Sequence, residues 1–216
     1  MKKERLKKDL FGSIWLTSGT AEPAIIRDTR DARWWLRWVA RALMRREAGT
    51  LAVLAGLEGV PAILKVDSAQ LSRTFISGRP LYEARPADAD FYRAMMRLLR
   101  NIHAAGVAHN DLAKEANILV DQNDQPAFID FQLAAFSKRR GALFRIAARE
   151  DIRHLLKHKR TYRPDLLTAR EQRILRTPSL PSRIYHATLK PVYLFVTRKL
   201  MGWADREGAA DRGRNS

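Results

Sequence analysis

Residues 109–120, HNDLAKEANILV, and residues 128–131, FIDF, form the stretch that decides the predicted fold of this chain. The polar beginning predicts a loop, and residues 118–120 predict a short apolar strand. Turn-forming residues over 121–124 then lead into a second predicted strand over 126–131. The stretch therefore predicts a β-hairpin that follows a polar loop and carries an acidic residue near its far end.

Three oxygen-bearing side chains fall within this unit. Asp111 is placed to accept a proton from a hydroxyl group, and Asn117 and Asp130 offer the oxygen ligands that Mg²⁺ prefers. Phosphoryl transfer needs mainly a positioned metal, a positioned nucleophile and neutralised phosphate charge. These residues predict a phosphotransfer site, and the plainer alternative is a polar loop between two core strands whose aspartates cap turns.

The same residues resemble the protein-kinase-like superfamily, whose pattern is His-x-Asp-Leu-x-x-x-Asn followed by Asp-Phe-Gly. The chain matches this pattern at His109, Asp111, Leu112, Asn117, Asp130 and Phe131, with Gln132 in place of the glycine. It looks most like the small bacterial atypical kinases of the RIO and lipopolysaccharide-kinase type. The resemblance implies an α+β, bilobal fold with a small N-terminal β-sheet lobe and a reduced, mainly helical C-terminal lobe.

Two departures from the family pattern lie in and after the loop. The spacing from Asp111 to Asn117 is one residue longer than usual, which predicts a bulge within residues 113–116. By resemblance, Lys114 corresponds to the loop lysine that contacts the transferring phosphoryl group. Gln132 removes a position that tolerates positive φ, so a large flip of the preceding phenylalanine is disfavoured.

The upstream sequence supplies counterparts of the phosphate-binding residues of such a lobe. A predicted strand over 10–16 resembles the end of a glycine-rich loop, with Gly12 at its last glycine position. A second strand, 24–27, ends in Arg27, where the family has a lysine that contacts the α- and β-phosphates. Arginine stays charged and can bind phosphate with two donors, so it is a workable replacement.

A helix predicted over residues 32–57 carries Glu47 in its second half. The resemblance pairs Glu47 with Arg27, whereas a solvated charge among neighbouring arginines is the alternative. Residues 71–81 resemble the strand and hinge between lobes, and backbone groups of Phe75 and Ile76 would meet the adenine of ATP.

An amphipathic helix predicted over 91–105 precedes the polar loop. Further helices are predicted over 148–159, 168–175 and 190–203, and the last either completes the large lobe or lies on a membrane surface. The expected domains are an N-lobe over residues 1–77, a reduced C-lobe over 78–207 and a frayed end over 208–216.

Composition narrows the class of protein. The chain has 216 residues, is 46% hydrophobic and contains no cysteine, which excludes disulfides and thiolate metal sites. It has no apolar run of transmembrane length and no apolar signal core, so we expect a cytoplasmic protein, with a peripheral position at the inner membrane as an alternative.

Positive charge is concentrated in the second part of the chain. The net charge is +17, with 20 Lys and Arg against 16 Asp and Glu over residues 1–136, and 20 against 7 over residues 137–216. A basic region of this kind attracts an anionic membrane surface or RNA, although a merely solubilising surface gives the same pattern. Residues 33–38, RWWLRW, suit either packing of a long helix or a membrane interface.

The sequence as a whole predicts a kinase that uses ATP and Mg²⁺. Asp111, Lys114 and Asn117 are its expected catalytic residues, and Asn117 and Asp130 its expected metal ligands. The acceptor hydroxyl belongs either to a serine or threonine of a protein or to a sugar of an envelope glycolipid. The competing prediction is a catalytically weak pseudokinase that binds RNA, membrane or a partner protein.

Overall fold

The protein is described by a computed structural model that covers residues 2–19 and 23–177. The chain forms a mixed α+β structure, and its residues up to Arg176 belong to one compact unit. The helix predicted over 190–203, the frayed end over 208–216 and the last part of the basic C-terminal region, residues 178–216, lie outside the described residues. The proposed division between residues 77 and 78 stays a prediction.

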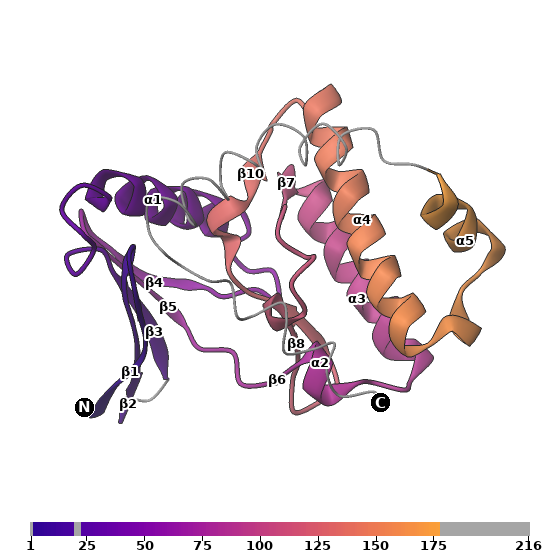
Figure 1. Ribbon diagram of the computed structural model, residues 1–216, viewed down its shortest axis with the longest axis horizontal. Helices are drawn as coiled ribbons and strands as arrows, with labels where there is room; N and C mark the ends of the chain where they lie inside the picture. Colours follow the sequence, from indigo (N-terminus) through magenta and orange to yellow (C-terminus); the bar gives the residue numbers. More distant parts are fainter. Residues whose placement is uncertain (1, 20–22, 178–216) are drawn as a thin grey trace. The chain divides into compact units, whose positions relative to one another are not determined.

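A five-stranded antiparallel sheet forms the first half of this unit, in the order β1-β2-β3-β5-β4 (Figure 1). Its strands are β1 (Lys2–Asp9), β2 (Gly12–Ser18), β3 (Ala24–Asp28), β4 (Ile63–Val66) and β5 (Gln70–Thr74). The sequence did not predict β1, because its side chains are charged on both faces. It is an edge strand, where charged residues are tolerated, and Lys3 lies over the ring of Trp15 on β2.

One long helix, α1 (Arg37–Val53), packs against β4 and β5. Met44 and Ala48 of this helix form a small buried cluster with Leu71 of β5. The expected start at residue 32 and end at residue 57 were both wrong. Residues 34–36 form a turn instead of helix, and the chain leaves the helix at Leu54, shortly before a glycine with positive φ.

The second half is mainly helical. It contains β6 (Arg79–Pro80), α2 (Leu81–Ala84), α3 (Ala89–Ala104), α4 (Ala142–Tyr162), the 3-10 turn η3 (Pro164–Leu166) and α5 (Ala169–Arg176). Asp88 caps α3 by accepting a hydrogen bond from the Asp90 amide at 2.9 Å. Helix α4 is longer than the predicted 148–159: it begins six residues earlier, with Leu143 and Arg145 exposed on its first turns, and ends three residues later.

Short strands join the helices and carry the polar loop. The predicted hairpin is present as β8 (Ile118–Val120) paired with β9 (Pro126–Phe128), but β9 ends three residues before the expected end at residue 131. The remaining short elements are β7 (Val107–Ala108), β10 (Ala135–Phe136) and the 3-10 turns η1 (Glu115–Asn117) and η2 (Phe131–Leu133). Strand β7 pairs with β10, so the segment after the hairpin returns beside the start of the loop.

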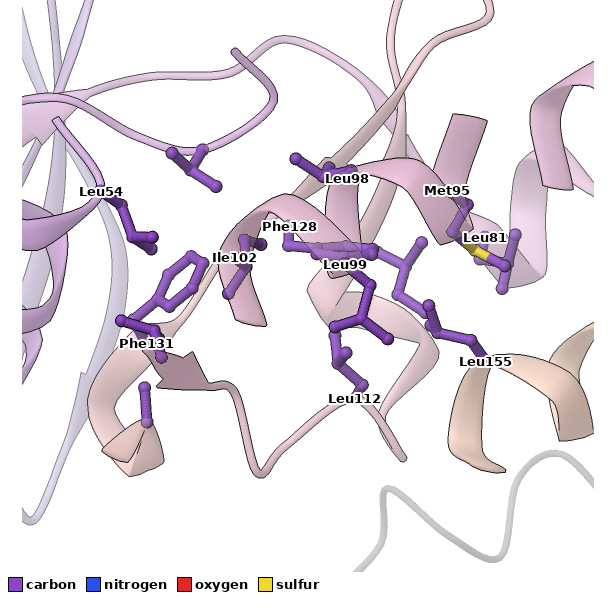
Figure 2. Packing of buried hydrophobic residues seen from close by; sticks show 14 of the residues in the cluster. Leu54, Leu81, Met95, Leu98, Leu99, Ile102, Leu112, Phe128, Phe131 and Leu155 are labelled. Carbon is purple, nitrogen blue, oxygen red and sulfur yellow. The ribbon is translucent and has the colours of Figure 1, made fainter. Parts of the chain in front are cut away.

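A single large core connects the two halves (Figure 2). Leu54, directly after α1, lies near Phe131, while Leu99 and Phe128 pack deeper among the helices. The end of α1 therefore shares a hydrophobic core with α3 and α4, which fixes α1 relative to the loop. Every helix in the described ranges is too short or too polar to cross a bilayer.

Candidate functional site

The polar loop at residues 109–111 is held in place by one buried carboxylate, that of Asp151 on α4. Its Oδ2 accepts the backbone N–H of His109 at 2.8 Å, and its Oδ1 accepts that of Asn110 at 2.9 Å. The Nε2 atom of His103 lies 3.1 Å from Oδ2. Asn110 has φ of 65°, a left-handed conformation that costs energy and persists only where surrounding contacts enforce it. Asp151 supplies those contacts.

His109 fixes the loop from its other side. Its ring is fully buried, with Nε2 at 3.0 Å from the Ile129 carbonyl and Nδ1 accepting from the Asp111 amide at 3.4 Å. A carbonyl can only accept, so Nε2 carries the proton. Burial lowers the pKa of His109, which keeps this neutral arrangement in place. The ring also lies 4.5 Å from that of Phe131, centre to centre.

Asp111, Lys114 and Asn117 come together as the sequence predicts. The Nζ atom of Lys114 donates to Asp111 Oδ2 at 2.8 Å, and Asn117 Nδ2 donates to the same oxygen at 3.0 Å. Asn117 Nδ2 also donates to the Asp111 carbonyl at 2.9 Å. Asn117 is buried, whereas the Lys114 side chain is 62% exposed. The carboxylate is thus oriented from inside while its cationic partner faces solvent.

Asp130 follows β9 and lies next to this group. The Ile129 amide donates to the Asn117 carbonyl at 3.0 Å, which sets the residue before Asp130 against η1. Asp130 has φ of 64°, and its Oδ1 accepts from Gln132 Nε2 at 2.5 Å. The left-handed backbone at Asp130 ends the strand earlier than predicted and turns the chain into η2.

Charge around Asp130 comes from both halves of the unit. Burial raises the pKa of Asp130, but the positive charges of Arg27, Arg73 and Lys114, with the hydrogen bond from Gln132, outweigh burial and hold it below its ordinary value. Arg27 and Arg73 belong to the sheet, whereas Lys114 belongs to the loop. The ionised form of Asp130 is therefore favoured by positive charge from both halves.

Glu47 of α1 is fully buried between two arginines of the sheet. Its Oε2 lies 3.2 Å from Nε of Arg27 on β3, and its Oε1 lies 3.2 Å from Nε of Arg73 on β5. The predicted pairing of Glu47 with Arg27 is present, and the alternative of a solvated Glu47 is wrong. The Nε atoms of both arginines and the two oxygens of Glu47 are close enough for ion pairs, but within the described residues they are not aligned for hydrogen bonds. Arg73 was missed by sequence reasoning. It pairs with Ile25, two residues before Arg27 on β3, so both arginines lie on the same face of the sheet.

Gly12 and the segment after β5 have structural roles of their own. A Cβ atom on Gly12 would meet the Asp28 carbonyl oxygen at 2.1 Å, and Gly12 has φ of +129°, so glycine is required there by close packing. The Phe75 amide donates to the Pro23 carbonyl at 3.0 Å, so this donor is already used within the protein. The assignments of Gly12, Phe75 and Ile76 to nucleotide binding stay predictions.

The donor set suits Mg²⁺ bound together with phosphate. Among the described residues, the side chain of Asn117 donates two hydrogen bonds through Nδ2, so Oδ1 is the atom that it would offer to a cation. Gln132 bonds Oδ1 of Asp130, which leaves Oδ2. No cluster of three or more His, Cys, Asp or Glu metal ligands occurs in residues 2–19 and 23–177. Mg²⁺ is usually held by one or two carboxylates together with substrate phosphates, so the pair fits such an ion.

A second attachment between the loop and α4 involves the predicted bulge. Glu115 accepts a hydrogen bond from the hydroxyl of Tyr162, and its Oε1 lies 3.4 Å from Nδ1 of His158. The Nε2 atom of His158 lies 2.8 Å from the Leu112 carbonyl. Burial raises the pKa of Glu115, but its bonds to His158 and Tyr162 outweigh burial and lower it. The extra loop residue is therefore accommodated in η1, with Glu115 turned toward α4.

Helix α1 also contacts the segment that follows Asp130. Arg46 Nε donates to the Ala134 carbonyl at 2.5 Å, beside a cavity of about 390 Å³. The cavity is lined by Arg46, Gly49, Thr50, Ala134, Ala135 and Phe136. Because α1 also carries Glu47, a shift of this helix would change its contacts with both the arginine pair and the segment after Asp130.

Comparison with known proteins does not extend this description. No protein-family model matches the chain, and no curated protein matches it.

Proposed function

We propose that the protein is a kinase-like phosphotransferase that moves the γ-phosphoryl group of ATP to a hydroxyl group, with Mg²⁺ as the metal. The observation that carries this proposal is the electrostatic setting of Asp130. A carboxylate whose pKa is lowered by two arginines of the sheet and one lysine of the loop, and whose neighbour Ile129 is bonded to the Asn117 backbone, is suited to hold a metal-bound polyphosphate. A turn-capping aspartate needs no such surroundings.

The fold supports the proposal in coarse terms. A small antiparallel sheet with one helix precedes a mainly helical half, and the loop and hairpin lie within that second half, between α3 and α4, with α1 of the first half in contact with η2 just after them. We propose that these halves correspond to the two lobes of a protein-kinase-like fold of the RIO and lipopolysaccharide-kinase type. On this proposal the nucleotide lies where Arg27, Arg73 and Asp130 approach one another.

Each residue of the site then has a defined task. Bound Mg²⁺ would neutralise charge on the β- and γ-phosphates, with Asn117 Oδ1 and Asp130 Oδ2 as its protein ligands. Arg27, held in place by Glu47, would face the phosphates of ATP. Asp111 would orient the acceptor hydroxyl and take its proton as the new oxygen–phosphorus bond forms.

The transfer step breaks one phosphorus–oxygen bond as the other forms. The bond from the γ-phosphorus to the bridging oxygen breaks, and ADP departs with the electron pair. Lys114, already bonded to Asp111 Oδ2 and mostly exposed, would contact the phosphoryl group in transfer. The acceptor is a serine or threonine hydroxyl of a protein or a sugar hydroxyl of an envelope glycolipid, and the basic region over residues 137–216 would favour acidic acceptors.

A second candidate function is a pseudokinase that binds a partner without catalysis. Two observations favour it: both arginines near Asp130 are paired with Glu47, and the Phe75 amide is occupied by Pro23. Each reduces the groups that remain for nucleotide. The trio of Asp111, Asn117 and Asp130 favours catalysis instead, because a pure binding module does not need an oriented carboxylate beside a metal site.

Thermal unfolding with and without Mg²⁺ and ATP tests nucleotide binding. At about one hundred times the dissociation constant, ligand adds about 2.7 kcal/mol of stability, or roughly 5–11 °C in Tm for a chain of this size. Asp130→Asn should abolish most of this shift. Asp124→Asn is the matched control, because it removes one charge from the exposed turn at the other end of the same hairpin and asparagine tolerates its positive φ. Equal shifts in all three proteins would refute metal-assisted binding at Asp130.

Incubation with labelled ATP identifies the acceptor class. The full-length protein is mixed separately with an envelope fraction and a soluble extract of the source cell, and label is followed in each. Asp111→Asn should reduce transfer by about 10²–10⁴-fold while the Mg²⁺-ATP shift in Tm persists. Binding without any transfer by the wild-type protein would favour the pseudokinase, whereas transfer that survives in Asp111→Asn would contradict the assigned role of Asp111.

A further inference from the structure

Three tryptophans at the start of α1 are exposed to solvent. The exposed fraction is 82% for Trp34, 38% for Trp35 and 73% for Trp38. Tryptophan is usually highly buried, because its large apolar ring contributes strongly to stability when it is removed from water. Neighbouring exposed indoles therefore mark a surface that is covered by something else. Packing of these rings on the sheet, one of the two sequence-based interpretations, is not observed for Trp34 or Trp38.

The backbone that presents these rings is fixed by hydrogen bonds. The Thr29 amide donates to the Ala69 carbonyl at 2.8 Å, and the Arg33 amide donates to the Leu10 carbonyl at 3.2 Å. Ala32 and Leu36 are buried on either side of the exposed rings. The segment thus points its small and aliphatic side chains inward and its indoles outward from a defined turn. We call residues Arg33–Trp38 the tryptophan turn.

Cations outnumber acidic side chains in and just before the tryptophan turn, since residues 28–37 carry three arginines and two aspartates. Arg33 is exposed within the turn, and Arg37 donates to the Arg30 carbonyl at 3.3 Å. Asp28 is paired with Arg30 at 2.7 Å, and Asp31 accepts from the Ser13 hydroxyl at 2.5 Å. The surface therefore combines projecting indoles with net positive charge.

We propose that the tryptophan turn is a docking surface for an anionic lipid bilayer. Indole rings favour the headgroup region of a membrane, where the ring is buried and its N–H stays hydrated. Arginines beside them are attracted by anionic headgroups. The proposal is independent of the phosphotransfer function, since it requires only a surface and no nucleotide.

Other occupants fit the surface less well. Residues 178–216 contain 7 Lys and Arg against 3 Asp and Glu, and a second copy of the chain carries the net charge of +17, so both are repelled by the arginines of the turn. Single-stranded nucleic acid is bound in charged grooves whose walls carry aromatic platforms. A ring that is 82% exposed, as Trp34 is, has too little protein beside it to form such a wall.

Sedimentation of the full-length protein with vesicles tests the proposal. Vesicles of phosphatidylcholine alone are compared with vesicles of phosphatidylcholine and phosphatidylglycerol in equal parts, at low and at high salt. We expect binding to the anionic vesicles only, weakened by salt. Trp34→Ala combined with Trp38→Ala should lower the partition coefficient by at least about tenfold. The apolar control is Leu64→Ala with Val66→Ala, two exposed residues of β4 that should leave binding unchanged.

Charge is tested by a second matched pair. Arg33→Gln with Arg37→Gln should lower binding to anionic vesicles by about thirtyfold. Arg97→Gln with Arg100→Gln removes the same charge from the exposed side of α3 and should change it by much less. Equal losses in the two double variants would show general attraction of a basic protein and would overturn the proposal.

Fluorescence of the wild-type protein gives a readout that does not depend on how a variant folds. Insertion of the indoles should shift the tryptophan emission to the blue on anionic vesicles and allow quenching by brominated lipid. Trp34→Phe with Trp38→Phe should remove most of this shift. No shift in the wild-type protein would overturn the proposal, as would vesicle binding that is unchanged in the alanine variant or a tryptophan-dependent response to single-stranded RNA that exceeds the response to vesicles.

Discussion

Replacement of Glu47 by glutamine is the sharpest test of the link between α1 and the sheet. Glutamine keeps the size of the side chain and removes its charge. Two buried guanidinium groups, at 3.2 Å in the native protein, then lose the carboxylate that neutralises both of them. The perturbation is local, because Glu47 is fully buried and contacts no solvent.

The expected cost follows from that burial. Removal of one partner from a buried ion pair typically destabilises a protein by about 3–5 kcal/mol, because the remaining charge is left without compensation. Asp130 also interacts electrostatically with Arg27 and Arg73, so part of the loss is offset and we place the effect near the lower limit. A loss of about 3 kcal/mol corresponds to a decrease in Tm of roughly 6–12 °C for a chain of this size.

Urea unfolding and calorimetry measure the change. Glu58→Gln is the control, because Glu58 is exposed in the loop after α1 and its loss should alter stability by less than about 0.5 kcal/mol. Adding Arg73→Met to Glu47→Gln should recover part of the lost stability, since it removes one of the two uncompensated cations. A Glu47→Gln protein within about 1 kcal/mol of wild type, or no recovery in the double variant, would refute the buried network.

Three further outcomes follow from the site. Asp151→Asn should lower turnover about tenfold, because the loop loses an acceptor for its backbone amides, while the Mg²⁺-ATP shift in Tm is kept. Unchanged turnover in a phosphotransfer assay would argue against this positioning role of Asp151. Burial lowers the pKa of His109 and His154 from 6.5, so the unfolded chain binds more protons than the folded protein and the free energy of unfolding should fall as pH drops below about 6.5. In urea titrations, His154→Gln should lose less stability with falling pH than wild type, by up to about 1.4 kcal/mol per pH unit. Gln132→Ala should raise the pKa of Asp130 toward its ordinary value. As pH is lowered, the Mg²⁺-ATP shift in Tm should therefore disappear at a higher pH than in wild type. Identical pH profiles would exclude this role for Gln132.

Local sequence signals were reliable where a segment's own pattern determines its structure. The apolar spacing over 91–105 predicted α3, which spans Ala89–Ala104, and the turn formers over 121–124 predicted the hairpin of β8 and β9. Asp111, Lys114 and Asn117 were grouped correctly because they share one short loop, in which sequence proximity nearly guarantees spatial proximity.

The same signals failed where neighbours in space decide the outcome. The charged residues of β1 carry no strand pattern, and pairing along β2 alone makes them a strand. Asp130 ends β9 early because its left-handed backbone is held by packing and by Gln132. The indoles of Trp34 and Trp38 were compatible with packing or exposure, and the turn at residues 34–36 placed them outward.

The amino-acid sequence alone determined α3, the hairpin of β8 and β9, the grouping of the polar loop residues and the basic character of the chain, because these depend on residue type and on spacing within one segment. Tertiary structure decided that Arg73 shares Glu47 with Arg27, that Asp151 holds the loop, and that cations from the sheet act on Asp130. These interactions join residues that lie about 20 to 100 positions apart in the chain. The shared core of α1, α3 and α4 brings them together. Interactions across such separations depend on how buried surfaces pack, which no local pattern of side chains records.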